Sequence, residues 1–426
     1  MTFQENNLAD LCEIVSSKRV FAASYQSEGI PFYRGKEISQ LARGEKTTAE
    51  LYISKEVYRD VISRTGPINP GDILLTAVGT LGNPYLVKES NLPFYFKDGN
   101  IVWLRNYSEL IDANFLFYWL NSEYGRRKVL DTAIGSTQAA LTISGLGEIE
   151  ISFPSRSQQD GIVNILSAID EKISVNNALS KTLEDIAQTI FKSWFVDFDP
   201  VKAKMAGEKP AGMDAATVAL FPDSMEESEL GLIPKGWKVS NLKYLSFVRY
   251  GAPFASKLFN TTKVGLPLIR IRDLKKQSIS TWSPENHTKG FLVSGGELLV
   301  GMDGEFNPTI WFGADALVNQ RICKIEPKDF VSNFFLYFTL LPIMRRIEHG
   351  STGSTVIHLG KTDIDAIKVC EPSQKILAEY KSMVEPMLRQ MVSLNIQTRI
   401  LQEARDALLP RLISGELQIP EEMLAS

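Results

Sequence analysis

The sequence predicts an α+β protein in which two similar globular domains alternate with two long helices. Three observations support this fold class. An apolar seven-residue spacing runs through the middle of the chain, a second one lies near its end, and short motifs recur in the same order before each of them. A chain of 426 residues also exceeds one ordinary hydrophobic core, which favours two or three domains.

The first long helix is expected between Ser157 and Pro200. Its heptad seam is formed by Ile162, Ile169, Leu183 and Ile190, with a polar residue, Asn176, at the remaining heptad position. Three further apolar residues, placed three positions later, complete the predicted seam: Ile165, Leu179 and Ile186. A helix of about 35 residues, roughly 50 Å long, needs a partner helix to cover such a stripe.

The second long helix supplies that partner. At an offset of 218 residues the seam maps onto Tyr380, Met387, Leu394, Leu401 and Leu408. If the two helices pack antiparallel, as a coiled coil, the two globular domains stand at opposite ends of a rod. Asn176 either fixes the register of this pair or lies at a solvated end of the seam.

The globular domains repeat one another. Each contains the same series of strand-like runs, turns and one amphipathic helix, separated by insertions of varied length, as expected for a shared scaffold with variable loops. The matched positions begin at Gly29 and Gly265, Gly71 and Gly296, Asn114 and Asn333, Gly135 and Gly353, and Ile149 and Ile367.

The repeat predicts five segments. Residues 1–156 form the first globular domain and 157–199 the central helix. Residues 200–236 are rich in Gly, Pro, Ala and acidic residues, which is typical of a linker. Residues 237–372 form the second domain, and 373–426 form the terminal helix and a tail.

Charge is distributed unevenly between the domains. The net charge of the chain is -4, yet residues 1–150 carry 15 Lys+Arg against 18 Asp+Glu, and residues 237–370 carry 17 against 11. The second domain is therefore basic by six charges, which fits either a nucleic-acid partner or a merely soluble surface.

Other classes of function find little support in the composition. The three cysteines are widely separated, and the three histidines lie outside any metal-binding spacing, so we expect neither a disulfide framework nor a metal site. No run of eighteen apolar residues and no signal peptide is present, so we expect a cytoplasmic protein without a membrane partner.

A family resemblance rests on the motif from Trp194 to Lys204, on the Gly-Ser-Thr loops, and on the terminal stretch from Leu408 to Leu417. With these motifs, and over essentially its whole length, the chain resembles the specificity subunit of type I restriction-modification enzymes. The resemblance implies two target-recognition domains alternating with two conserved helices. It also implies a non-catalytic role, in which each domain reads one half of a bipartite, asymmetric DNA site.

The resemblance also implies partners. These are double-stranded DNA, two modification (methyltransferase) subunits and two restriction (motor-nuclease) subunits. The chain itself would bind no cofactor, since S-adenosylmethionine, ATP and magnesium belong to the partner subunits. The helices would set the unread spacer and dock the modification subunits. Trp194, Phe195 and Phe198 are then candidate interface residues, with burial against the adjoining domain as the alternative.

Candidate DNA-binding residues fall into two groups. Arg34 and Lys36 match Arg270 and Arg272 in strand-like runs whose alternation places both basic residues on one face. Such a face suits phosphates or guanine, although a solvated sheet edge has the same pattern. Lys275 and Lys361 extend the positive charge of the second domain.

The second group lies in the Gly-Ser-Thr loops. Their backbone N–H groups and hydroxyls suit phosphate oxygens, and a glutamine suits an adenine edge, although a plain turn would also explain them. The candidates are Ser136, Thr137, Gln138, Ser351, Thr352, Ser354 and Thr355.

Two other functions are the alternatives. A stand-alone DNA methyltransferase would require a glycine-rich cofactor loop and a complete Asn-Pro-Pro-Tyr element, whereas Asn83-Pro84 and Asn307-Pro308 are expected to be simple turns. A stand-alone DNA-binding protein or a coiled-coil scaffold without a restriction-modification role is the other alternative. A pure scaffold gives no reason for the two domains to repeat one another.

Overall fold

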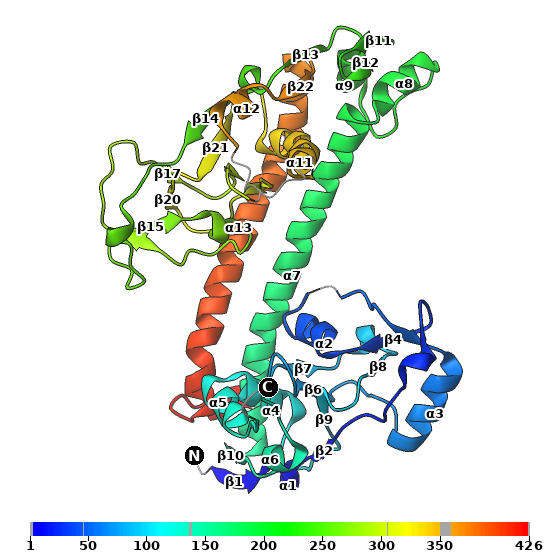
Figure 1. Ribbon diagram of the computed structural model, residues 1–426, viewed down its shortest axis with the longest axis vertical. Coiled ribbons are helices and arrows are strands. Elements are labelled where there is room, and N and C mark those ends of the chain that lie inside the picture. The colour runs from blue at the N-terminus through cyan, green and yellow to red at the C-terminus, as the bar shows by residue number, and fades with distance from the viewer. Residues whose placement is uncertain (1–2, 46, 136–138, 305, 350–358, 425–426) are drawn as a thin grey trace. The chain divides into compact units, whose positions relative to one another are not determined.

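The computed structural model describes residues 3–45, 47–135, 139–304, 306–349 and 359–424. The chain divides into two compact units. Unit 1 contains residues 1–171 and 401–426, and unit 2 contains residues 172–400. Each unit combines one mixed domain of strands and helices with parts of two long helices (Figure 1). The predicted α+β class is confirmed.

The first domain is built on two four-stranded sheets. One has the order β2-β9-β6-β7, formed by Glu13–Val15, Ile101–Arg105, Ile73–Thr76 and Pro84–Leu86, and all its pairs are antiparallel. The other has the order β3-β5-β4-β8, formed by Tyr25–Gln26, Tyr52–Ile53, Ile30–Tyr33 and Tyr95–Phe96, in which β4 and β8 run parallel. Strand β1 (Gln4–Asn7) pairs with β10 (Glu150–Phe153).

The second domain repeats the order of the first sheet and of three strands of the other sheet, whose fourth strand lies at the opposite edge. The order β14-β21-β18-β19, formed by Ser246–Tyr250, Ile322–Pro327, Leu298–Gly301 and Pro308–Ile310, is antiparallel throughout. The order β16-β15-β20-β17, formed by Trp282–Ser283, Leu266–Ile269, Ala316–Val318 and Leu292–Val293, has one parallel pair, β15 with β20. Strand β13 (Lys238–Asn241) pairs with β22 (Lys368–Glu371), as β1 does with β10.

The helices of the first domain are α1 (Leu8–Leu11), α2 (Gly35–Ala42), α3 (Lys55–Thr65), α4 (Ala113–Asn121), α5 (Glu123–Asp131) and α6 (Ile143–Gly147). The one amphipathic helix that was expected in the first domain, near Asn114, is broken at Ser122, whose hydroxyl accepts a hydrogen bond from the backbone N–H of Gly125 and caps α5. The second domain has α10 (Ile271–Leu274), α11 (Asn333–His349) and α12 (Lys361–Asp365).

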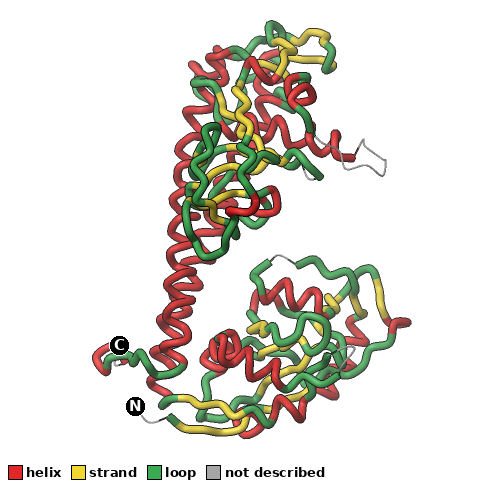
Figure 2. Tube along the Cα trace, turned by 60° about the vertical axis from the view of Figure 1, so that its left-hand side comes forward, coloured by secondary structure: helices red, strands yellow, loops and turns green. Residues whose placement is uncertain are grey.

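The long helices are α7 (Arg156–Phe195) and α13 (Gln374–Ile413), each of 40 residues. They run antiparallel in both units. In unit 2, Tyr380 Oη donates to the carbonyl of Ala187 (3.1 Å) and Asn395 Nδ2 donates to Ser180 Oγ (3.3 Å). In unit 1, Arg405 Nη1 of α13 donates a hydrogen bond to Asp170 Oδ1 of α7 (2.9 Å). Figure 2 shows the helical segments as continuous red tubes.

The seam of α7 differs in phase from the prediction. Ile162 is buried as expected, but the second set of buried positions lies four residues later, at Leu166, Ile173 and Ala187. The expected residues Leu179 and Ile186 are instead 40% and 42% exposed. Asn176 is 1% exposed, so it belongs to the buried seam and not to a solvated end.

The segment expected to be a linker is folded. It contains α8 (Asp199–Met205), α9 (Ala215–Leu220) and a hairpin of β11 (Met225–Ser228) with β12 (Gly231–Pro234). Val201, Phe221 and Ile233 are buried in the core of unit 2. A short helix, α14 (Glu421–Leu424), follows α13 near the C-terminus.

Candidate nucleic-acid interface

Both domains contain the same strand-to-helix corner. Strand β4 ends at Tyr33 and α2 begins at Gly35, with Arg34 as its N-cap; β15 ends at Ile269 and α10 begins at Ile271, with Arg270 as its N-cap. The strand prediction was therefore wrong for Lys36 and Arg272, which lie in the first helical turns. The physical reason is capping, since an acidic residue at the third helical position competes with strand continuation.

The capping contacts are equivalent in the two corners. The backbone N–H of Arg34 donates to Glu37 Oε2, and that of Arg270 donates to Asp273 Oδ2, both at 2.9 Å. Glu37 and Asp273 are 1% and 3% exposed. Burial alone would raise the pKa of Glu37, but hydrogen bonds from the Arg34 guanidinium and from backbone N–H groups outweigh it, and the pKa is lowered.

In the first domain the basic side chains of this corner are held by carboxylates. Arg34 Nη2 lies 2.8 Å from Glu37 Oε1 and 2.5 Å from Glu50 Oε2, and Lys36 Nζ lies 2.5 Å from Glu50 Oε1. Two basic residues thus share two acidic ones. The corner carries no excess positive charge of its own.

In the second domain the same positions are less neutralised. The Arg270 guanidinium lies over the ring of Phe259, 5.7 Å from its centroid, and within the described ranges it forms no ion pair. Arg272 reaches the hydroxyls of Ser280 (3.3 Å) and Thr281 (3.5 Å), and its Nε is 4.0 Å from Asp273 Oδ1. Its side chain remains 59% exposed. These two guanidiniums are available to phosphate oxygens.

Other basic candidates are scattered around the second domain. Lys275 is the exposed C-cap of α10, and Lys361 is the exposed first residue of α12. The structure thus brings Arg270, Arg272 and Lys275 together on one short segment and leaves Lys361 on a different element.

The Gly-Ser-Thr loop residues fall outside the described ranges: Ser136, Thr137, Gln138, Ser351, Thr352, Ser354 and Thr355. Their roles remain predictions. Next to the first loop, Ile134 and Ala140 form an antiparallel bridge. The Asn-Pro pairs were expected to be turns, but each leads from a loop into a strand, since Pro84 begins β7 and Pro308 begins β19.

The aromatic residues Trp194, Phe195 and Phe198 belong to the core of unit 2. Trp194 and Phe195 are 4% and 8% exposed. The ring of Trp194 is tilted against that of Tyr380, with 6.1 Å between the ring centroids, and the ring of Phe195 meets Tyr380 edge-to-face at 5.1 Å. Phe198 is partly buried against Trp237. Trp194 and Phe195 are therefore buried against the adjoining domain, which was the alternative to an interface role, and they offer a partner almost no surface. A role of these residues in docking the modification subunits stays a prediction.

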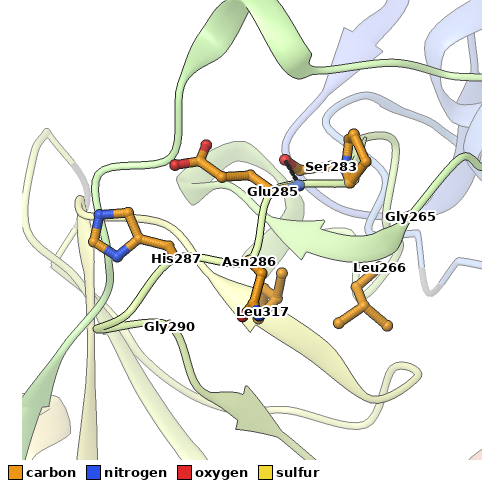
Figure 3. A pocket seen from close by; sticks show the side chains of 9 residues that line it. Gly265, Leu266, Ser283, Glu285, Asn286, His287, Gly290 and Leu317 are labelled. Atoms are coloured by element: carbon orange, nitrogen blue, oxygen red, sulfur yellow. Dashed lines mark hydrogen bonds between the residues drawn. The ribbon is translucent and has the colours of Figure 1, made fainter.

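A small cavity of about 160 Å³ lies beside the start of β15 in the second domain (Figure 3). Its lining includes Gly265, Leu266 and Leu317, with the loop that follows β16 on the other side. The polar groups of that loop are used internally: Glu285 Oε2 accepts from the N–H of Ala255 (2.6 Å), and His287 Nδ1 accepts from the N–H of Lys289 (3.1 Å). This leaves no set of convergent polar groups for a ligand.

Cysteine chemistry is not favoured. Cys12 and Cys323 are buried free thiols, and burial raises the pKa of each to about 12, so thiolates are rare at neutral pH. Among the described residues there is no cluster of three or more His, Cys, Asp or Glu side chains able to hold a metal ion. Over the same ranges, none of the helices combines the length and apolarity needed to cross a membrane.

Glu50 and Ser280 were missed from the sequence. They occupy equivalent positions in the two domains. Glu50 lies two residues before the first residue of β5, and Ser280 lies two residues before the first residue of β16. The N–H of Phe32 donates to the carbonyl of Leu51, and the N–H of Leu268 donates to that of Thr281, which fixes the correspondence. Only the strand register reveals it, because the sequence between the motifs differs in length and composition.

Comparisons with known proteins agree with this architecture. Over 400 residues the chain is 25% identical to the type I restriction enzyme HindI specificity subunit of Haemophilus influenzae, covering 82% of this chain and 87% of the relative. Over 428 residues it is 26% identical to the MjaIX specificity subunit of Methanocaldococcus jannaschii, covering 93% and 89%.

The fold has also been seen in a crystal structure. The S subunit of a type I restriction-modification system from M. genitalium matches with a TM-score of 0.58 at 15% sequence identity, covering 96% of each chain. The family model for the type I restriction modification DNA specificity domain matches residues 1–185 and 234–384, one region for each repeat. This chain therefore belongs to the family of type I restriction-modification DNA specificity proteins.

Proposed function

We propose that the chain is the DNA sequence-recognition subunit of a type I restriction-modification complex. Each recognition domain reads one half of a bipartite, asymmetric site on double-stranded DNA. The observation that carries the proposal is the repetition of one four-stranded sheet, and of three strands of a second sheet, in two domains of one chain whose loops differ. Two similar readers with different loops suit two different half-sites.

The long helices act as the spacer in this proposal. A helix of 40 residues measures about 60 Å, so α7 and α13 are long enough to span several base pairs that neither domain reads. The same helices also present partly exposed apolar residues, such as Leu179 and Ile186, that suit helices of a partner subunit. These side chains replace the buried aromatic residues as the favoured docking surface.

The chain does no chemistry itself in this proposal. Two modification subunits bring S-adenosylmethionine and methylate the DNA, and two restriction subunits bring ATP and magnesium to translocate and cut it. The proposed place of action is the cytoplasm, where these subunits meet the DNA. The chain's contribution is to position both kinds of subunit at one sequence.

Co-expression with candidate modification subunits tests the proposal. N6-methyladenine in the host DNA is mapped with and without this chain. The expected result is one bipartite motif that is methylated only when the chain is present. A folded, co-purifying complex that adds no methylation would overturn the proposal and would favour a scaffold role.

A further inference from the structure

The two recognition domains differ in their charged contacts at the strand-to-helix corner that both contain. In the first domain Glu50 bridges Arg34 and Lys36, with one carboxylate oxygen 2.5 Å from each basic group. In the second domain the equivalent position is Ser280, which carries no charge. Its hydroxyl donates to Asp273 Oδ1 (3.0 Å) and accepts from Arg272 Nη2 (3.3 Å).

The Glu50 carboxylate occupies the place in which a DNA phosphate could contact Arg34 and Lys36. It offers two oxygens of one anion to a guanidinium and an ammonium group, as a DNA phosphate would. Both Glu50 and Lys36 are exposed, with 51% and 63% of their side chains accessible, so solvent and a competing anion reach this contact. An exposed ion pair of this kind is weak enough for a polyanion to displace.

At this corner of the second domain, the described residues include no exposed carboxylate in the place of Glu50, and the buried Asp273 lies 4.0 Å from Arg272 Nε. The buried carboxylate of Asp273 is occupied by the backbone N–H of Arg270 and by Ser280. Arg270 is therefore left over the Phe259 ring, and within the described residues no acidic side chain pairs with it. The net charges of the two domains agree with this difference, since residues 1–150 carry a net charge of -3 and residues 237–370 a net charge of +6.

We propose that Glu50 is an internal competitor for DNA phosphates at Arg34 and Lys36, and that Ser280 leaves the equivalent phosphate-binding site at Arg270 and Arg272 open. The second domain then supplies most of the sequence-independent affinity for the DNA backbone, and the first domain binds only with help from base contacts. This inference rests on the proposed DNA-recognition function and adds an unequal division of affinity between the domains.

Two substitutions in the full-length chain test the inference. E50Q removes the competing anion, and S280E introduces one at the equivalent position. Binding to a random-sequence DNA duplex is measured by fluorescence anisotropy at several salt concentrations. One additional phosphate contact makes the slope of log affinity against log salt about 0.9 steeper, which corresponds to about 8-fold tighter binding at 0.1 M salt. We expect this gain for E50Q and a loss of the same size for S280E.

Matched controls isolate the contact from net charge. E45Q removes an exposed glutamate that pairs with Arg43 in the same domain, at 2.6 Å, and S382E adds a charge on α13 of unit 2. We expect both controls to change the affinity by less than half as much. All four variants alter exposed side chains, so circular dichroism should show the folded state of the unchanged chain.

The outcomes separate the inference from the proposed function. If E50Q and S280E bind as E45Q and S382E do, while the unchanged chain binds DNA, the inference is wrong and the proposed function stands. If the unchanged chain binds no duplex at any salt concentration, and no methylation depends on it, both are overturned.

Discussion

Asp170 in α7 accepts two hydrogen bonds within unit 1, one at each carboxylate oxygen. Arg405 Nη1 of α13 donates to Oδ1 and Tyr118 Oη of α4 donates to Oδ2, both at 2.9 Å. One carboxylate therefore joins the two long helices to the first recognition domain. Burial and the nearby Asp170 charge both raise the pKa of Tyr118, so its hydroxyl stays protonated and remains a donor.

The substitution D170A should destabilise unit 1. It removes two charge-assisted hydrogen bonds at a site about one third exposed, so we expect a loss of about 1–3 kcal/mol in the free energy of unfolding. Urea unfolding measures this loss. The neighbouring substitution E171A removes an exposed acid of the same charge and should cost less than about 0.5 kcal/mol. Equal effects of D170A and E171A would contradict this role.

The substitution W194A should destabilise unit 2 much more. Trp194 is buried among Phe195, Phe221 and Tyr380, so its removal leaves a large cavity and should cost about 3–5 kcal/mol. Thermal unfolding measures the change. V196A, at a site 54% exposed, is the control and should have little effect. A stable W194A protein that fails only to bind modification subunits would instead support an interface role.

Glu37 should contribute to stability above its ordinary pKa near 4.5 and lose this contribution in acid. Its folded-state pKa is lowered, so the folded chain binds the proton less readily than the unfolded chain. We expect E37Q to be less stable than the unchanged chain at pH 7, and the difference to shrink as the pH falls below about 4.5. Urea unfolding across this pH range measures it.

The control for Glu37 is E28Q, at an exposed glutamate of the same domain. Its unfolding curve should run parallel to that of the unchanged chain throughout the pH range. A gap between E37Q and the unchanged chain that stays constant down to pH 3 would mean that the Glu37 charge is not responsible.

Shortening both long helices should shorten the unread spacer. In unit 2 the contacts pair falling positions of α7 with rising positions of α13, as Ala187 with Tyr380 and Ser180 with Asn395 show. On the register of Ser180 with Asn395, residues 175–181 match residues 394–400 within unit 2, and deleting both removes about 10 Å of helix, or about three base pairs. Methylation mapping should show unchanged half-sites with a shorter spacer, or no activity. Altered half-site sequences would contradict the spacer role.

Much of the fold could be predicted because it depends on repeated, local patterns. The heptad positions of Ile162 and Tyr380 and the order of glycine turns established two helices and two equivalent domains. The phase of the seam could not be predicted in full. Apolar residues stand both three and four positions after Ile162 and after Leu183, and only the packing of both helices selects Leu166 over Ile165 and Ala187 over Ile186.

The candidate site was predictable in residue type but not in geometry. The sequence identified Arg34 and Arg270 as matched positions. The predicted strands extended past these arginines, however, because Glu37 and Asp273 were not recognised as the acids that cap the following helices. The role of Glu50 could not be predicted from the sequence, because Glu50 lies 16 residues from Arg34 and their contact depends on how β5 pairs with β4.

Exchange of one recognition domain tests most directly that each domain reads one half of the site. Residues 237–372 are replaced by the corresponding domain of the HindI relative, and the methylated motif is mapped in cells that also express the modification subunits. The account predicts that one half-site changes, while the other half-site is kept. A motif unchanged in both halves, or changed in both, would contradict it.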